Sequence, residues 1–237
     1  MRRGSFGAGM QWCKGANMGI VFTIMDNTAP FSFTCPPPQR STLREAALAH
    51  LARFGTTRQG LEQVLLRRVA RWAQKAQRAG DCAENVAEHA AHLHPVVVAV
   101  VDDMVRLGAV DDAVFARSRV RRLVRSGRST RAVQAHLAAK GVAADVRDEA
   151  LEEAVGTLSS TERELCAALV LARKRRLGPF GVSVNAEDMD EAARMAGQNR
   201  ALGVLARAGF TRDVAQRVLD MPPEEAEDWM DRLRAES

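Results

Sequence analysis

Residues 108–142, GAVDDAVFARSRVRRLVRSGRSTRAVQAHLAAKGV, carry the clearest structural pattern in the chain. Asp111 or Asp112 is placed to cap a helix that runs to about Arg125, because Asp is a preferred N-cap residue. Gly127 follows where a helix commonly ends in a left-handed residue. The stretch therefore opens with a capped helix and a glycine turn.

The same stretch continues into two more predicted helices. The second runs from Ser129 or Thr130 to Lys140 and stops at Gly141, and Asp145 caps a third. The third helix carries its apolar residues at Val146, Ala150, Leu151 and Val155. Turns of only a few residues between the helices favour a compact three-helix unit.

The arginines of this unit form a candidate binding face. Between residues 111 and 141, seven arginines and Lys140 face only two acids, a net charge of +6. A helical projection separates an apolar side of the first helix from a basic stripe. We predict a partner or DNA-binding face made of Arg117, Arg121, Arg122, Arg125, Arg128, Arg131 and Lys140. Arg173, Lys174, Arg175 and Arg176 are a candidate extension of this face.

Related patterns on both sides predict an all-α fold of tandem three-helix, helix-turn-helix-like repeats that form an elongated, curved array. The segments 138–151 and 206–219 align without gaps, pairing Gly141 with Gly209. Such repeats share a core between neighbours. The expected organisation is a disordered extension at 1–40, a first unit at 41–107 with an insert at 73–94, a basic second unit at 108–156, a third unit at 157–221 and an acidic tail at 222–237.

Local signals define several further boundaries. Thr56 or Thr57 can cap the second helix of the first unit, and Pro95 is expected in the first turn of its third helix. Thr161 and Glu164 have the spacing of a capping box. The segment 224–237 has a net charge of −4 and is expected to be a solvated helix or a frayed end.

Composition limits the class of protein. The chain has 237 residues, a formal charge of +5 and 34 Lys and Arg residues, of which only four are Lys. Arginine suits planar contacts with phosphate or carboxylate. A GC-rich genome would produce the same excess of arginine without any function. Only the positions of the arginines can distinguish a binding role from this codon bias. The longest apolar runs, at 19–25 and 95–101, are far shorter than the roughly 20 residues of a membrane span.

Signatures of enzymes and metal sites are missing from the sequence. It contains no GxGxxG, GxxxxGK[ST], GxSxG or HExxH motif, so no catalytic residue and no cofactor are expected. The four cysteines form no CxxC pair, and His89, His92 and His94 fit no common metal site, so an exposed histidine patch is expected. The cysteine pattern favours a reducing cytoplasm. The few aromatic residues do not interleave with the arginines, which argues against a base-stacking binder.

The stretch at 108–142 resembles the RecX family of recombination regulators. The resemblance rests on the Gly-hydrophobic-hydrophobic-Asp-Asp opening, Phe115-Ala116, the Arg-rich helix, Gly127 and the close at Lys140-Gly141-Val142. The segments 51–69 and 205–219 look like the family's first and last units. The sequence departs from the family pattern at Arg128-Ser129-Thr130, where a Lys-Gly-Pro-like sequence is common.

The resemblance implies a regulator that binds the RecA recombinase filament in its helical groove. It implies inhibition of strand exchange and ATP hydrolysis, a role in DNA repair and the SOS response, and weak contact with DNA. The expected protein is a cytoplasmic monomer with no enzymatic activity. The alternative is a helix-turn-helix transcription regulator, which would read a preferred duplex sequence with one recognition helix, usually as a symmetric dimer.

Overall fold

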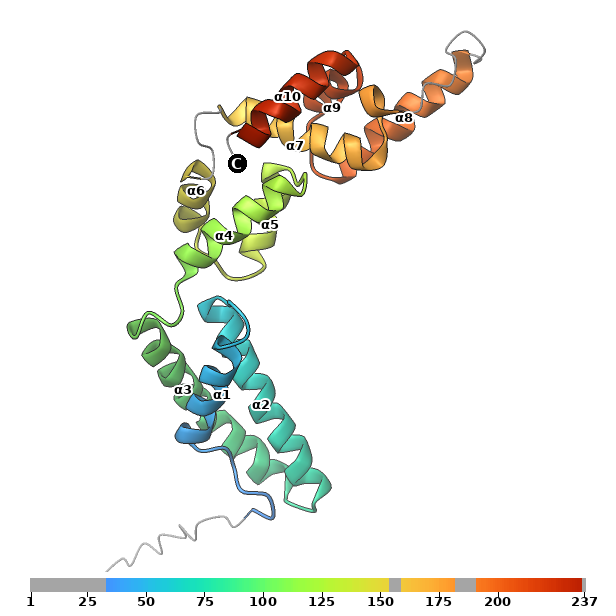
Figure 1. The fold of residues 1–237 in the computed structure, drawn as a ribbon. Helices are drawn as coiled ribbons and strands as arrows, with labels where there is room; N and C mark the ends of the chain where they lie inside the picture. The colour runs from blue at the N-terminus through green and yellow to red at the C-terminus, as the bar shows by residue number, and fades with distance from the viewer. Residues whose placement is uncertain (1–32, 154–158, 182–190, 236–237) are drawn as a thin grey trace, which may run out of the picture. The chain divides into compact units, whose positions relative to one another are not determined.

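The described elements of the chain are all helices, and they form three groups in chain order (Figure 1). The computed structural model describes residues 33–153, 159–181 and 191–235. The expected disorder of residues 1–32 and the expected helical role of Val155 lie outside these residues. The all-α fold of tandem three-helix units is confirmed.

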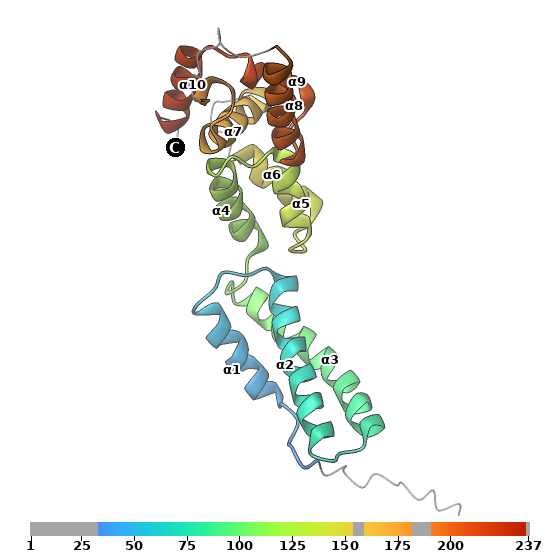
Figure 2. The same cartoon turned by 90° about the vertical axis from the view of Figure 1, so that its right-hand side faces the viewer.

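The first group consists of α1 (Arg40–Leu51), α2 (Arg58–Arg78) and α3 (Ala83–Arg106), which lie side by side in Figure 2. Leu61, Leu65 and Val69 recur every four residues along α2, so they share the face that meets the other two helices. The core is completed by Leu43, Ala47, Trp72, Ala76, Val86, Leu93, Val97, Val100, Val101, Met104 and Val110. Thr57 is the N-cap of α2, as predicted, because its side chain accepts from Gly60 N.

The region 73–94, expected as an insert, is helical over most of its length and lengthens two helices of the first group. The second helix continues to Arg78 and the third begins at Ala83, which places Pro95 inside α3 rather than in its first turn. Ala76 and Val86 are fully buried, so the apolar period does continue here. The pattern was not recognised in the sequence because some of its buried positions are occupied by alanine and because polar residues lie between them.

Residues 33–39 are ordered against the first group, which corrects the C-terminal part of the expected disordered extension. The ring of Phe33 meets Trp72 edge to face at 5.4 Å, and Trp72 Nε1 donates to the carbonyl of Cys35 at 2.9 Å. Thr34 donates to Asp81 from its backbone N–H and its hydroxyl, and these bonds hold the pKa of Asp81 below its usual range. A buried indole N–H needs a partner, and this segment supplies it.

The second group consists of α4 (Asp112–Arg125), α5 (Thr130–Ala138) and α6 (Ala144–Glu153). Asp111 caps α4 and Ser129 caps α5, each with a side-chain oxygen that accepts backbone N–H groups. Asp145 lies within the first turn of α6 and is therefore not its N-cap. The buried core is small, so this group depends on its neighbours. Its members are Ala116, Val120, Val133, Leu137, Val142, Ala150 and Leu151.

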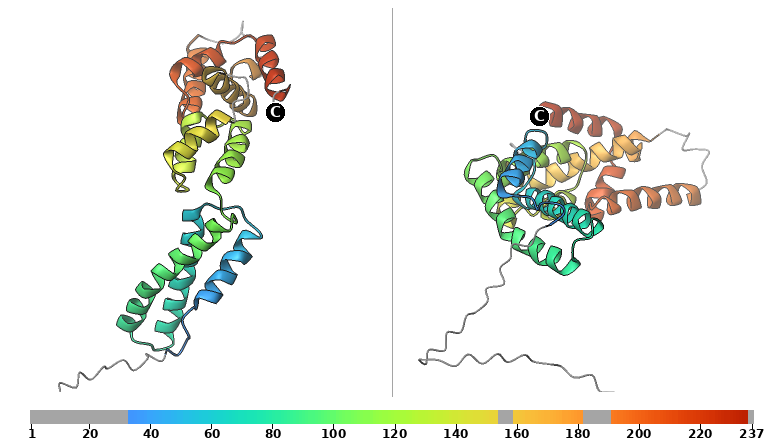
Figure 3. Two further views of the ribbon diagram at one scale, coloured as in Figure 1. Left: turned by 90° about the vertical axis from the view of Figure 1, so that its left-hand side faces the viewer. Right: turned by 90° about the horizontal axis from the view of Figure 1, so that it is seen from below.

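The third group consists of α7 (Ser160–Arg175), a short 3-10 helix η1 (Gly178–Phe180), α8 (Glu191–Arg207), α9 (Arg212–Leu219) and α10 (Pro223–Ala235). Figure 3 shows α7 beside α9 in two views. The capping box at the start of α7 is formed by Ser159 and Glu162, two residues before the predicted pair. Both pairs have the required spacing, so the sequence alone left the register open.

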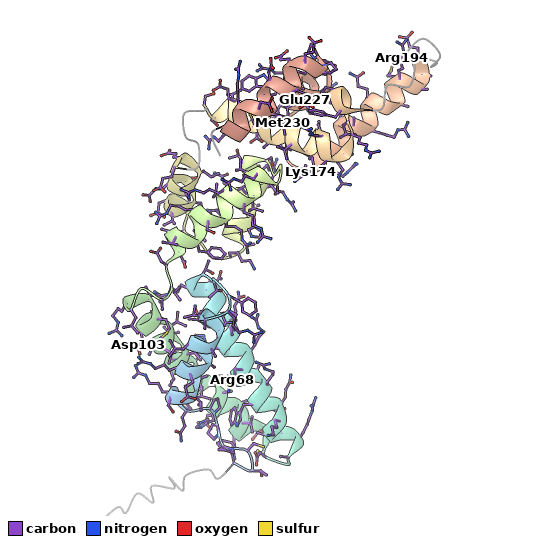
Figure 4. The ribbon with its side chains drawn as sticks, in the orientation of Figure 1. Arg68, Asp103, Lys174, Arg194, Glu227 and Met230 are labelled. Atoms are coloured by element: carbon purple, nitrogen blue, oxygen red, sulfur yellow. The ribbon has the colours of Figure 1, made fainter. Side chains whose placement is uncertain are left out.

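The acidic tail was predicted to be a solvated helix or a frayed end, and it does form a helix, α10, but part of this helix is buried. Ala226 and Met230 of α10 are buried, together with Met221, in the core built around α7. Figure 4 labels Met230 and Glu227 on this helix, and Glu227 Oε2 lies 3.1 Å from Arg173 Nη1. The i, i+4 pair of apolar residues was masked by the surrounding acids, and α10 adds a fourth helix to the third group.

Candidate interaction surface

The basic stripe lies where the helical projection of α4 placed it. Ala116 and Val120 are fully buried on the apolar side, and Leu123 and Val124 pack against the same core. The predicted basic residues Arg121, Arg122, Arg125, Arg128, Arg131 and Lys140 are all exposed. The core of the second group therefore holds α4 with Arg121, Arg122 and Arg125 directed outward, while Arg128, Arg131 and Lys140 are exposed on the turns and on α5.

Arg117 differs from the rest of the predicted face. Its Nε lies 3.5 Å from Glu153 Oε2 on α6, and both side chains are only partly exposed. Few acids stand near the stripe in the sequence, but Glu153 belongs to the third helix of the unit and reaches α4 only in the fold. Arg117 is therefore engaged in an ion pair within the second group.

The first and second groups meet at a junction built on the N-terminus of α2, here named the first junction. The hydroxyl of Thr57 donates to the carbonyl of Lys140 at 2.6 Å, and Thr57 is only 1% exposed. The backbone N–H of Arg58 donates to Asp112 Oδ1 at 2.8 Å. The helix cap of α2 thus also fastens it to the turn between α5 and α6 and to the start of α4.

The second and third groups meet in the same way at the N-terminus of α5, here named the second junction. The hydroxyl of Ser129 donates to the carbonyl of Ala208 at 2.8 Å, and Ser129 is fully buried. The N–H and hydroxyl of Thr130 donate to Glu164 Oε2 at 2.9 and 2.6 Å. Glu164, which was predicted to belong to the capping box of α7, accepts these two hydrogen bonds instead.

Glycine follows the accepting carbonyl at both junctions. Gly141 and Gly209 have φ angles of +77° and +93°, a region that favours glycine. A Cβ on Gly141 would lie 2.0 Å from Gln59 Oε1, and one on Gly209 would lie 2.5 Å from Ser129 Oγ. The predicted pairing of these two glycines is confirmed as a repeat in space, and the close approach of the preceding unit explains it.

A basic groove accompanies the first junction and is named the first groove. It consists of two adjoining hollows of about 290 and 300 Å³ that share Phe54, Gly55, Phe115 and Arg119. Its cations are Arg53, Arg67, Arg119, Arg122 and Lys140. Phe54 is 54% exposed, the guanidinium of Arg53 lies 5.6 Å from its ring, and that of Arg119 lies 5.4 Å from the ring of Phe115. The prediction that aromatic residues and arginines do not mix is therefore wrong at this groove.

A second basic groove of about 570 Å³ accompanies the second junction and is named the second groove. Its cations are Arg128, Lys174, Arg175 and Arg207, and its apolar residues are Leu171 and Val204. Lys174, labelled on α7 in Figure 4, donates to the carbonyl of Ser126 at 2.9 Å. The fold thus brings two residues of the predicted extension beside Arg128.

The other two residues of the predicted extension have different surroundings. Arg173 pairs with Glu227 of α10 and lies over the ring of Phe180 at 5.8 Å. Arg176 ends α7 in the left-handed conformation, with φ of 54°. The four-residue cluster is therefore divided between the groove and the packing of α10.

Cations of both grooves act on one histidine. Burial lowers the pKa of His136 below its ordinary value, and the charges of Arg119, Lys140 and Arg128 lower it further. Among the described residues that line the two grooves, none is acidic. Burial and these nearby cations therefore both favour the neutral form of His136.

Sequence reasoning missed Arg53, Arg67, Arg119 and Arg207. Each lines a groove that forms only where two neighbouring units meet. The available signal was the repeat itself, since residues beside Gly55, Gly127, Gly141 and Gly209 recur at the junctions.

The described residues offer little for metal chemistry. They contain no group of three or more His, Cys, Asp or Glu side chains placed to hold a metal ion. His92 and His94 are exposed beside Glu88 and Glu62, whereas His89 packs against Phe33 and Trp72 with ring centroids 5.1 and 5.6 Å away. The expected histidine patch is therefore wrong for His89. No helix in the described part of the chain is both long and apolar enough to cross a membrane.

Known proteins are similar to this chain in sequence. The family model for the second three-helix domain of RecX matches residues 111–151. Regulatory protein RecX of Myxococcus xanthus is 35% identical over 181 residues, which cover 76% of this chain and 86% of that protein. Regulatory protein RecX of Mycobacterium tuberculosis is 31% identical over 187 residues, with 78% and 91% covered. The crystal structure of RecX from Lactobacillus salivarius matches with a TM-score of 0.49 and 17% identity, over 79% of this chain and 96% of that one.

The repeated cap-to-turn junctions define an all-helical repeat protein with basic grooves between its units. The similarity to the Myxococcus xanthus protein spans most of both chains, and this chain belongs to the RecX family. The matched relatives are named as regulatory proteins and not as enzymes.

Proposed function

We propose that this protein binds the RecA recombinase filament and inhibits its strand-exchange and ATP-hydrolysis activities, as a regulator of DNA repair and the SOS response. Membership of the RecX family supports the class of partner. The observation that carries the proposal is the pair of basic grooves at two successive junctions of a helical array, in which no described lining residue is acidic. A repeated surface suits a partner that is itself a repeating filament.

The cations divide into two sets in this proposal. Arg122 and Lys140 contact the filament from the first groove, and Arg128, Lys174 and Arg175 contact it from the second. The exposed cations Arg121, Arg125 and Arg131 extend the surface between them. Charge of this kind speeds encounter and selects partners of opposite charge. We propose weak DNA contact through the same cations, and a cytoplasmic monomer without enzymatic activity.

The alternative of a helix-turn-helix transcription regulator is disfavoured by the second junction. In such proteins the N-terminal residues of the second helix contact base edges in the major groove. In a helix-turn-helix built from α4 and α5 this second helix is α5, and Ser129 is fully buried while Thr130 is bonded to Glu164 of α7. The end of the helix that would read DNA is therefore occupied by the next unit.

The test is the ATPase of RecA on single-stranded DNA, together with strand exchange, measured with increasing amounts of the purified protein. The proposal predicts that both activities fall as the protein is added. No change of either activity at a micromolar excess would overturn the proposal. A duplex-selection experiment run in parallel should return no strong palindromic motif, and such a motif would favour the alternative.

A further inference from the structure

The two grooves occupy equivalent places in the repeat. The side chains of Phe115, Ser118 and Arg119 on α4 line the first groove, and those of Leu171, Lys174 and Arg175 on α7 line the second at the same i, i+3, i+4 spacing. Each groove is closed on one side by a helix-connecting turn that contains Gly55 or Gly127. On the other side stands the turn whose carbonyl accepts the cap hydroxyl.

The grooves also share their chemistry. Each has apolar lining side chains, here called its floor, which are Phe54, Val64 and Phe115 in the first groove and Leu171 and Val204 in the second. Each has a rim of exposed cations, with Arg53, Arg122 and Lys140 on the first and Arg128, Lys174, Arg175 and Arg207 on the second. The partner must therefore supply negative charge and apolar surface together.

This combination fits a peptide better than a nucleic-acid strand. Phosphates would use the rim, but the aliphatic floor of the second groove offers no aromatic face for a base. In the first groove, Arg53 lies over the ring of Phe54 and the ring of His50 lies 5.3 Å from it. An acidic peptide with an apolar side chain uses both rim and floor in both grooves.

We propose that each groove binds an acidic peptide segment, whose carboxylates pair with the rim arginines while one apolar side chain lies on the floor. The inference deepens the proposed function and rests on it, because a filament presents the same segment from successive subunits. Two equivalent grooves then engage two segments of one filament, and the second contact gains from the effective concentration set by the first.

The experiment measures binding of a fluorescent acidic peptide with one central Leu to the full-length protein by anisotropy at low salt. A second peptide replaces this Leu with Ser, and a third replaces the acids with Gln. The inference predicts binding of the first peptide and about 10-fold weaker binding of each control peptide. Unlabelled oligo(dT) should displace the first peptide poorly.

Matched variants assign the binding to the grooves. Arg128→Glu with Arg175→Glu should weaken binding by about 10-fold, whereas Arg68→Glu with Arg71→Glu, two exposed arginines of α2 outside both grooves, should change it by less than about 2-fold. Phe54→Ser should weaken binding, and Leu48→Ser, which removes an apolar side chain 46% exposed on α1, should not. Thermal melts confirm that each variant is folded.

Several outcomes would overturn the inference. These are no peptide binding, equal binding of the Leu and Ser peptides, equal loss in groove and control variants, or efficient displacement by oligo(dT), which would assign the grooves to nucleic acid. If the peptide does not bind while the protein still inhibits RecA, the inference fails and the proposed function stands. If the peptide binds and RecA is unaffected, the proposed function fails instead.

Discussion

The first and second junctions are held by the same pattern of hydrogen bonds, but the helices that meet at each junction approach one another to different extents. At both, a buried hydroxyl cap donates to the carbonyl that precedes a left-handed glycine, and the next backbone N–H donates to a carboxylate. At the first, a Cβ added to Gly55 would meet nothing within 4 Å, whereas one added to Gly127 would lie 2.8 Å from the backbone N of Leu171. The hydrogen bonds between units are therefore the same at both junctions, whereas the distance between the packed helices differs.

The difference shows which parts of the repeat are free to change. The hydrogen bonds between units need a hydroxyl, a glycine and a carboxylate at fixed positions. The hydroxyl and the carboxylate each bond to a backbone group, and the glycine adopts a positive φ angle. The groove side chains need only occupy the space left between units, so they are aromatic at the first junction and aliphatic at the second. A helical array can keep its geometry in this way and still present different surfaces at each junction.

The largest expected effect is a difference in the free energy of unfolding between alanine substitutions at Gly127 and at Gly55. Gly127→Ala should destabilise the protein by about 3 kcal/mol, because its φ of +79° strains a Cβ and the backbone of α7 blocks it. Gly55→Ala should change stability by less than about 1 kcal/mol in either direction. Urea unfolding at equilibrium measures both. Equal effects would contradict the close approach of α7 at the second junction.

The next effect concerns the hydroxyl caps. Ser129→Ala and Thr57→Ala should each cost about 2 kcal/mol, because each removes a cap and leaves a junction carbonyl without its bond. Thr211→Ala is the matched control, since Thr211 accepts from Val214 N but is exposed, and it should cost only about 1 kcal/mol. Ser129→Thr and Thr57→Ser should retain most of the stability. The junction role is disproved if all three alanine variants cost the same.

The smallest expected effect is a pH dependence that arises beside both grooves. Because the folded protein holds the pKa of His136 below 6.5, the unfolded chain takes up a proton first as the pH falls, and stability should decrease from about pH 7 downward. Asp81, Asp103 and Glu162 also have lowered pKa values, but they act below about pH 5.

The measurement for this effect is the free energy of unfolding between about pH 7.5 and pH 5.5. His136→Gln should flatten the curve in that window. His92→Gln, which alters a 75% exposed histidine on α3, should leave the curve unchanged. A slope that persists in His136→Gln would assign the effect to another group.

Local signals predicted most of the helices and caps. Asp111, Ser129 and Thr57 cap helices through bonds within three residues, so their role is encoded next to them. The register of the capping box at α7 was open because the sequence holds two overlapping patterns. The second carboxylate, Glu164 of α7, accepts instead from Thr130 of the neighbouring unit. Local patterns therefore define the helices but not the bonds between units.

Long-range contacts explain what the sequence did not predict. The pairing of Trp72 with residues 33–35 joins segments far apart in the chain, and the packing of α10 depends on α7. The predicted stripe on α4 is real, but the grooves combine it with Arg53, Arg67, Lys174 and Arg207 from four other elements. Which cations share a groove is a property of the junctions and is not visible in the spacing of one helix.

The central claim is that the groove cations hold the protein on the RecA filament. Co-sedimentation with RecA filaments on single-stranded DNA, with ATP, measures this for the full-length protein and three double variants. Arg53→Glu with Arg122→Glu and Arg128→Glu with Arg175→Glu should each weaken binding by about 10-fold or more, and Arg68→Glu with Arg71→Glu should stay within about 2-fold of the unchanged protein. Equal binding by all four folded proteins would contradict the account.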